Sequence, residues 1–177
     1  MIREDIHLLT VFLNQHLPNW KILIPDLFNY LDFIKLNKRE YLPPERGDIY
    51  FVCSGNIGQY QKYQPLAYFE TGQPIINSFK RHQPKLKALT ESSVLHLARK
   101  NSYKLIQEYP GAIELHQEIM LMHLENVEFK ARLWNIGKQN RLNAFLNHFK
   151  LIFHLIPRNE TANFLGISRE TLRQSYV

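Results

Sequence analysis

The chain has 177 residues, of which 45% are hydrophobic and 12% aromatic, and it carries a formal net charge of +6. This apolar content is enough for a folded core. The single cysteine, Cys53, excludes a disulfide framework, an iron–sulfur cluster and a zinc site built on thiolates. Polar residues interrupt the apolar runs, and the N-terminal residues lack the pattern of a secretory signal. We therefore expect a cytoplasmic protein with no membrane partner.

The excess positive charge lies in the C-terminal quarter of the chain. Residues 130–177 contain eight basic and two acidic side chains, whereas the 129 residues before them contain 14 of each sign. A basic segment on a neutral body favours a polyanionic partner, because neutralising phosphates and releasing their counterions is the largest sequence-independent contribution to nucleic-acid binding. A solvated cationic surface with no partner is the alternative interpretation.

The first predicted elements, over about residues 2–33, are helical. Apolar residues recur at helical spacing from Ile6 to Leu13, and the spacing continues after Pro18 as far as Leu31. From about residue 34 to residue 98 the pattern changes to short apolar runs separated by turn residues. This pattern predicts strands in a small barrel or jelly roll rather than parallel βαβ units, with Cys53 in the core. The predicted strands include Ile49–Cys53, Ile57–Tyr63, Leu66–Phe69 and Val94–Leu97.

A long helix is predicted to follow the strands. Helical spacing returns after about Asn101, and Pro110 begins a stretch in which apolar or small residues recur at intervals of three and four over three heptads. This seam consists of Ile113, Gln117, Met120, Leu124, Val127, Ala131 and Trp134. A second apolar face consists of Ile119, Met122, Phe129, Leu133 and Ile136. We expect one face to pack on the strand domain and the other on a second copy of the chain; a long core helix of a monomer is the alternative.

Three further helices are predicted beyond this point. Gly137 ends the long helix or acts as a hinge, and an amphipathic helix with apolar residues from Leu142 to Ile156 follows, ended by Pro157. A short helix is expected from about Asn159 to Leu165, then a turn at residues 166–168, then a last helix from Arg169 to the end.

The last two predicted helices have the pattern of a helix-turn-helix. Ala162 is small where the two helices must approach closely, and Gly166, four residues later, suits a turn that needs a positive φ or no side chain. Ile167 and Leu172 supply the apolar contacts between the helices. Ser168 is an N-cap residue for the second helix.

The second helix of this pattern is expected to expose side chains that can bind DNA. Arg side chains recognise guanine, Glu recognises cytosine and Gln recognises adenine, whereas Ser and Thr hydroxyl groups bind phosphate. The candidate DNA-binding residues are Ser168, Arg169, Glu170, Thr171, Arg173 and Gln174. A helical corner that serves only packing is the alternative.

Three segments resemble the Crp–Fnr family of transcription regulators. Residues 163–172, NFLGISRETL, are similar to the family's helix-turn-helix, in which an S-R-E-T stretch opens the recognition helix. Residues 47–55, GDIYFVCSG, resemble its β-roll signature. Residues 102–106, which precede Tyr109 and Pro110, are similar to the segment that leads into its dimerisation helix. The likeness covers nearly the whole chain in the family's order.

The resemblance implies an α+β fold with three parts. Residues 1–109 would form a sensor-like β-roll, similar to a cyclic-nucleotide-binding domain with flanking helices. Residues 110–136 would form a dimerisation helix, and residues 137–177 a helix-turn-helix unit that is short and lacks the family's wing. The implied function is that of a homodimeric regulator that binds double-stranded DNA.

The resemblance also implies individual roles on the recognition helix. Arg169 and Glu170 would read bases, and Ser168 and Thr171 would contact phosphates. Gln174 stands where a second base-reading Arg is common in the family, so we expect a different DNA sequence to be read.

The effector region departs from the family pattern. Cyclic-nucleotide members bind the ribose through a Glu and the phosphate through an Arg followed by Ser or Thr, whereas residues 72–75 and 83–88 contain neither. We therefore expect no cyclic AMP binding in the usual manner, and the effector is unknown. Four basic residues could bind another anion or simply be solvated: Lys80, Arg81, Lys85 and Lys87.

No residue pattern predicts a cofactor, a metal site or catalysis. His116 and His123 share a helix face but lie seven residues, or about 10 Å, apart, which is too far for one ion. No nucleophile elbow, phosphate-binding Gly loop or dinucleotide fingerprint occurs, so we expect a protein that is not an enzyme.

The competing hypothesis is a dimeric β-roll module that binds a ligand or a protein and whose truncated helix-turn-helix no longer binds DNA. The solvent exposure of Arg169 and Arg173 distinguishes the two hypotheses. Their burial, or their ion pairing within the fold, would favour the module without DNA.

Overall fold

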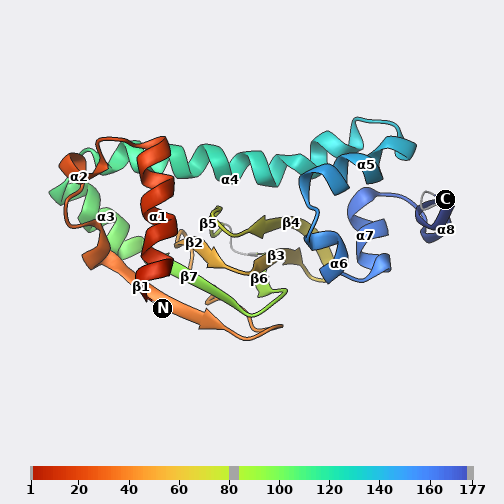
Figure 1. Cartoon of the computed structure of the whole chain (residues 1–177), viewed down its shortest axis with the longest axis horizontal. Helices are drawn as coiled ribbons and strands as arrows, with labels where there is room; N and C mark the ends of the chain where they lie inside the picture. Colours follow the sequence, from red (N-terminus) through yellow and green to blue (C-terminus); the bar gives the residue numbers. More distant parts are fainter. Residues whose placement is uncertain (1, 80–83, 175–177) are drawn as a thin grey trace.

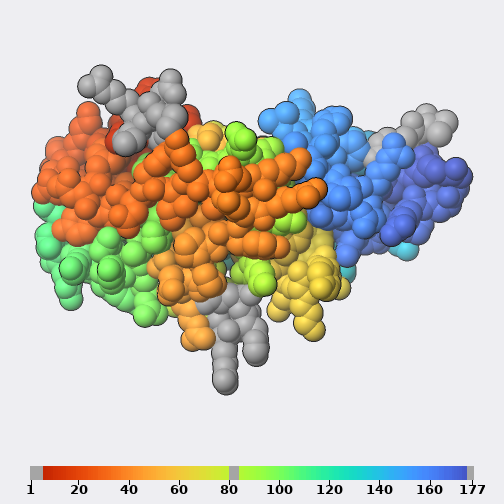
Figure 2. Space-filling model, turned by 90° about the horizontal axis from the view of Figure 1, so that it is seen from below, coloured from red at the N-terminus to blue at the C-terminus, as the bar shows by residue number. Residues whose placement is uncertain are grey.

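A computed structural model of the chain describes residues 2–79 and 84–174. In Figure 1 the strands lie beneath a long helix, α4, which runs along the upper edge of the molecule. Shorter helices form one end of the molecule, with α8 at its tip. Figure 2 shows this helical end projecting from the rest of the protein. We call residues 138–174 the helical unit.

The N-terminal helical region is shorter than predicted and is divided. Its elements are α1 Ile2–His16, α2 Trp20–Leu23 and a 3₁₀ helix, η1, Leu27–Tyr30. Pro18 and Pro25 lie at the two interruptions, where a proline disfavours helical backbone at the residue before it. The prediction of helix up to residue 33 is wrong at its end, because strand β1, Leu31–Leu36, begins there and pairs with β7.

The strands form two antiparallel sheets. Their bounds are β2 Ile49–Ser54, β3 Asn56–Gln61, β4 Gln64–Glu70, β5 Pro74–Ile76, β6 Lys85–Ala88 and β7 Ser92–Leu97. One sheet has the strand order β1-β7-β2-β5 and the other β4-β3-β6. The predicted runs correspond to β2, β3, β4 and β7, except that Lys62 and Tyr63 form the turn between β3 and β4.

Alternate side chains of β4 enter two different cores. Ala67 and Phe69 pack between the two sheets with apolar side chains of the neighbouring strands. Tyr68 points the other way, as the two-residue period of a strand requires, and packs with the helical unit. A third core lies under α1, where the rings of Phe12 and Phe51 are 5.2 Å apart and where Cys53 is buried as predicted.

Helix α4 follows α3 and spans most of the length of the molecule (Figure 1). Helix α3 is Arg99–Glu108 and α4 is Ala112–Trp134, which at 23 residues is about 35 Å long. On its second apolar face, Ile119, Phe129 and Leu133 are buried in the cores.

The seam of α4 faces solvent. Six of its seven side chains are exposed, and Val127 is half-buried. The prediction that the other face packs on the strand domain holds for Ile119, whereas Phe129 and Leu133 pack in the core of the helical unit and Ile136 lies beyond the helix and is exposed. That a second copy covers the seam stays a prediction.

The helix predicted from Leu142 to Ile156 is two helices. They are α5 Lys138–His148 and α6 Ile152–Leu155. Phe149 leaves the helical conformation, with φ −125° and ψ 64°, and both Phe149 and Ile152 are buried in the core that contains Tyr68. The last two helices begin where predicted: they are α7 Arg158–Leu165 and α8 Arg169–Gln174, and the predicted continuation of the last helix over residues 175–177 lies outside the described residues.

We predict that Phe149→Ala lowers the free energy of unfolding by about 3–5 kcal/mol, the usual cost of removing a buried phenyl ring. The ring of Phe149 contacts those of Tyr68, Phe129 and Phe145. Urea unfolding followed by circular dichroism measures the change. Leu151→Ala, two residues away at an exposed position, is the control. Equal costs for the two variants would contradict the placement of Phe149 in this core.

Candidate nucleic-acid interface

The turn between α7 and α8 is fixed by backbone hydrogen bonds. Gly166 has φ +62° and ψ +39°, a left-handed conformation that favours glycine. The N–H of Ile167 donates to the carbonyl of Ala162, and the N–H of Gly166 donates to that of Asn163, each over 3.1 Å. These two bonds form a Schellman motif, which ends α7 and reverses the chain. The predicted role of Gly166 is confirmed.

Ser168 caps α8 as predicted. Its Oγ accepts a hydrogen bond of 2.9 Å from the N–H of Thr171, and its carbonyl accepts one from the N–H of Leu172. The hydroxyl groups of Ser168 and Thr171 also lie 2.8 Å apart and share a hydrogen bond. The first turn of α8 is therefore held in shape before any ligand binds, and the phosphate-contacting role of these hydroxyl groups stays a prediction.

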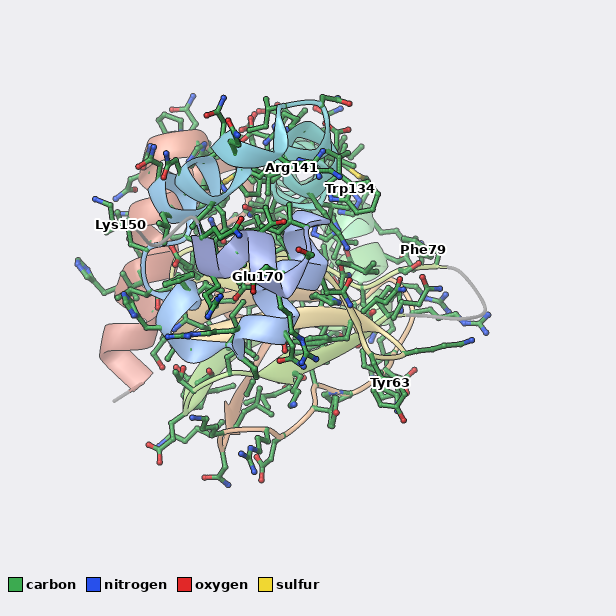
Figure 3. The ribbon with its side chains drawn as sticks, turned by 90° about the vertical axis from the view of Figure 1, so that its right-hand side faces the viewer. Tyr63, Phe79, Trp134, Arg141, Lys150 and Glu170 are labelled. Carbon is green, nitrogen blue, oxygen red and sulfur yellow. The ribbon has the colours of Figure 1, made fainter. Side chains whose placement is uncertain are left out.

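Helix α8 presents its polar side chains to solvent and buries only Leu172 among its described residues. Arg169, Glu170, Arg173 and Gln174 are exposed, and Figure 3 shows Glu170 near the centre of this end of the molecule. The structure thus brings the predicted base-reading residues together on one exposed helix.

Arg173 is ion-paired with its neighbour on the same helix. Its Nη2 lies 2.9 Å from Oε1 of Glu170, and Nε2 of Gln174 donates to the same oxygen over 3.3 Å. The Arg173 and Glu170 side chains remain 75% and 58% exposed. Such exposed pairs are worth only about 0.2–1 kcal/mol, so this pairing does not remove either side chain from a DNA partner.

Several of the eight C-terminal basic residues make contacts inside the chain. Lys130 donates to the carbonyl of Pro65 over 2.6 Å, and its burial lowers its pKa. Arg132 donates to the carbonyl of Glu125, and Arg141 donates to carbonyls of the turn before α8. The number of basic residues in the sequence is therefore larger than the number of basic side chains that are available to bind DNA.

One carboxylate joins the helical unit to the two sheets formed by β1–β7, which we call the β-domain. Oε1 of Glu160, in the first turn of α7, accepts hydrogen bonds from the hydroxyl of Tyr60 over 2.6 Å and from that of Tyr68 over 2.8 Å. The Tyr68 ring packs at the same place against Phe149 and Phe164. We call Tyr60, Tyr68 and Glu160 the tyrosine–glutamate contact; sequence patterns give no signal for it.

Three solved structures resemble the chain over most of its length. FixK2 from Bradyrhizobium japonicum matches with a TM-score of 0.64 and 16% identity over 82% of each chain. A transcriptional regulator of the Crp/Fnr family from Eubacterium rectale matches with a TM-score of 0.65 and 15% identity, over 91% of this chain and 85% of that one. The c-di-GMP-responsive global regulator CLP of Xanthomonas campestris matches with a TM-score of 0.61 and 20% identity, over 86% and 88%.

The chain has the Crp/Fnr fold. The α+β class predicted from the sequence is confirmed, with a β-roll of the cyclic-nucleotide-binding type, flanking helices, a long helix and a helix-turn-helix. No protein-family model and no curated protein sequence matches the chain.

In this Crp/Fnr fold, the segment that lacks the phosphate cassette makes contacts within the chain. Lys85 and Lys87 lie over the rings of Tyr41 and Tyr60, at 5.6 and 5.9 Å from the ring centres. Lys80 and Arg81 lie outside the described residues. Apolar side chains of the strands occupy the space between the sheets.

The histidines of α4 are not arranged for a metal. Nδ1 of His123 accepts a hydrogen bond of 3.2 Å from the N–H of Ile76, and its ring stacks on Phe69. Burial lowers the pKa of His123 to about 4, which keeps the ring neutral. Within residues 2–79 and 84–174, no group of three His, Cys, Asp or Glu side chains could hold a metal ion.

None of the helices in these ranges is long and apolar enough to cross a membrane.

We predict that the protein loses stability at alkaline pH. The pKa values of Tyr60 and Tyr68 are raised above the usual value of about 10, mainly by burial and further by Glu160. The unfolded chain ionises these hydroxyl groups near pH 10, whereas the folded protein keeps them protonated. The stability is therefore complete below that pH and falls as the pH rises above it.

Urea unfolding at a series of pH values on both sides of 10 measures this slope. Tyr68→Phe removes one of the two hydroxyl groups and should flatten the fall in stability above about pH 10. Tyr63→Phe, at the exposed tip of the same hairpin, is the control for losing a tyrosine hydroxyl. An unchanged slope in Tyr68→Phe would show that this hydroxyl does not carry the effect.

Proposed function

We propose that the chain is a homodimeric, DNA-binding transcription regulator of the Crp–Fnr type that acts in the cytoplasm. Residues 1–109 are the sensor-like domain, 110–136 the dimerisation helix and 137–177 the DNA-binding unit. The observation that carries this proposal is helix α8, which stands at the tip of the molecule behind a Schellman turn and exposes Arg169, Glu170, Arg173 and Gln174.

The chemistry of these side chains suits the major groove of DNA. A bidentate Arg169 would recognise guanine, Glu170 would accept from the amino group of cytosine, and Gln174 would recognise adenine. Glu170 exchanges its weak pairing with Arg173 for a base, which frees Arg173 for a phosphate. Ser168 and Thr171, at the capped start of the helix, lie where backbone phosphates are bound.

A second copy of the chain completes the proposed site. A helix-turn-helix dimer reads two half-sites whose centres lie about 34–36 Å apart, one turn of DNA. The seam of α4, with Ile113, Met120 and Leu124 each more than a third exposed, supports a two-helix interface along this helix. Cyclic AMP would not serve as the effector in the usual manner, since the acidic and Arg-Ser/Thr residues of the cassette are absent.

We predict that the protein binds duplex DNA with a salt-dependent affinity and that Arg169→Ala weakens binding by about 1–3 kcal/mol, roughly 5- to 150-fold. Fluorescence anisotropy over a series of salt concentrations measures both quantities. Arg46→Ala, which removes an exposed Arg from the β-domain, is the charge-matched control. Wild-type binding no tighter than that of Arg169→Ala, with no dependence on salt, would contradict the proposal.

We also predict that Leu124→Glu makes the protein monomeric. The substitution places a charge at a seam position of α4, where pairing with a second copy would bury it without a partner. Sedimentation velocity measures the oligomeric state. Leu151→Glu, at an exposed position on the helical unit, is the control and should leave the dimer intact. A monomeric wild-type protein would contradict the dimer.

A further inference from the structure

The guanidinium of Arg141 joins the end of α4 to the turn before α8. Its Nη2 donates to the carbonyl of Trp134 over 3.0 Å, and its Nε donates to that of Ile136 over 3.1 Å. On the other side, Nη1 donates to the carbonyls of Leu165 and Gly166 over 2.9 and 3.3 Å. One side chain thus bonds to the backbone of both segments. Figure 3 shows Arg141 and Trp134 close together beside α8.

These carbonyls lie at the C-terminal ends of α4 and α7. The last carbonyls of a helix have no partner within it, and they carry the negative end of the helix dipole. Arg suits this position because its planar group has several donors in a fixed fork and keeps its charge, whereas a Lys ammonium is a single point charge.

Trp134 makes a second link between the same two segments. Its indole Nε1 donates to the carbonyl of Phe164 over 3.2 Å. A Cβ placed on Gly166 would lie 3.2–3.3 Å from the Trp134 ring and from Nη1 of Arg141. Gly166 therefore lacks a side chain both for its positive φ and for this close approach.

We propose that Arg141 and Trp134 are positioning residues that set the orientation of α8 relative to α4; we call them the turn clamp. The inference rests on the proposed function. The tyrosine–glutamate contact fixes the first turn of α7 to the β-domain, whereas the turn clamp fixes the last residues of α7 and the turn before α8 to the end of the long helix. In a dimer joined along α4, the turn clamp sets the separation of the two recognition helices.

Distances between spin labels test the turn clamp without DNA. One pair of labels, at Glu125→Cys and Arg173→Cys, joins α4 to α8, and a control pair, at Glu125→Cys and Asn163→Cys, joins α4 to α7; all three positions are exposed. Both pairs are made in a Cys53→Ala background and diluted with unlabelled protein, so that a single subunit is labelled. Pulsed electron paramagnetic resonance then gives the two distance distributions.

The expected result is specific to α8. Arg141→Met should broaden the α4–α8 distribution about twofold or more and leave the α4–α7 distribution unchanged, and Arg141→Lys should not restore the narrow α4–α8 distribution. Arg132→Met, which removes an Arg from the same end of α4, should change neither. An unchanged α4–α8 distribution, or equal broadening of both, would overturn the inference. If Arg141→Met does not fold, the same two distance distributions are measured in Trp134→Phe, which loses the indole N–H, and the same outcomes apply.

Binding to DNA separates this inference from the proposed function. Duplexes selected by the wild-type protein from a random pool are lengthened by one or two base pairs between half-sites. We expect wild-type affinity to fall about tenfold or more and that of Arg141→Met to change less than about threefold, because a loosely held α8 tolerates altered spacing. A spacing preference in Arg141→Met equal to that of the wild type would overturn the turn clamp. If the wild type binds no DNA, the proposed function fails, and the label distances still decide the turn clamp.

Discussion

Two tyrosine hydroxyl groups share one carboxylate oxygen, and the placement of the whole helical unit depends on that contact. A buried hydroxyl without a partner costs free energy, and a carboxylate is the strongest acceptor that a side chain offers. Tyr60 and Tyr68 supply the donors from the β-domain, and Glu160 supplies the acceptor from the first turn of α7. With α7 fixed in this way, the turn at Gly166 can direct α8 outward, where Arg169 is exposed.

The parts of the interface that depend on local chemistry could be predicted from the sequence. Gly166 and Ser168 act through their own backbone and their nearest neighbours, so the turn and the cap follow from residue types and spacing. The strands that have turn residues on both sides could also be predicted, because these residues mark where each strand begins and ends. The roles of the α8 side chains toward DNA stay predictions.

The errors lie where distant segments decide the structure. Leu31 continues a helical spacing, but it pairs with Leu97 of β7, 66 residues away in the sequence. Phe149 and Ile152 also fit a continuous helix, and the chain breaks there with both side chains buried in one core with Tyr68. No sequence pattern indicates that Lys130 donates to a carbonyl of the β-domain, because only the folded chain brings the two groups near each other.

Strand β4 has one further consequence for the molecule. Its backbone is shared by two interiors, since Phe69 belongs to the filling of the roll and Tyr68 to that of the helical unit. Protein interiors are packed too tightly to absorb a displaced strand on one side alone. A movement that rearranges the roll on one side of β4 must therefore also rearrange the packing of the helical unit on its other side, so this strand couples the two halves of the protein.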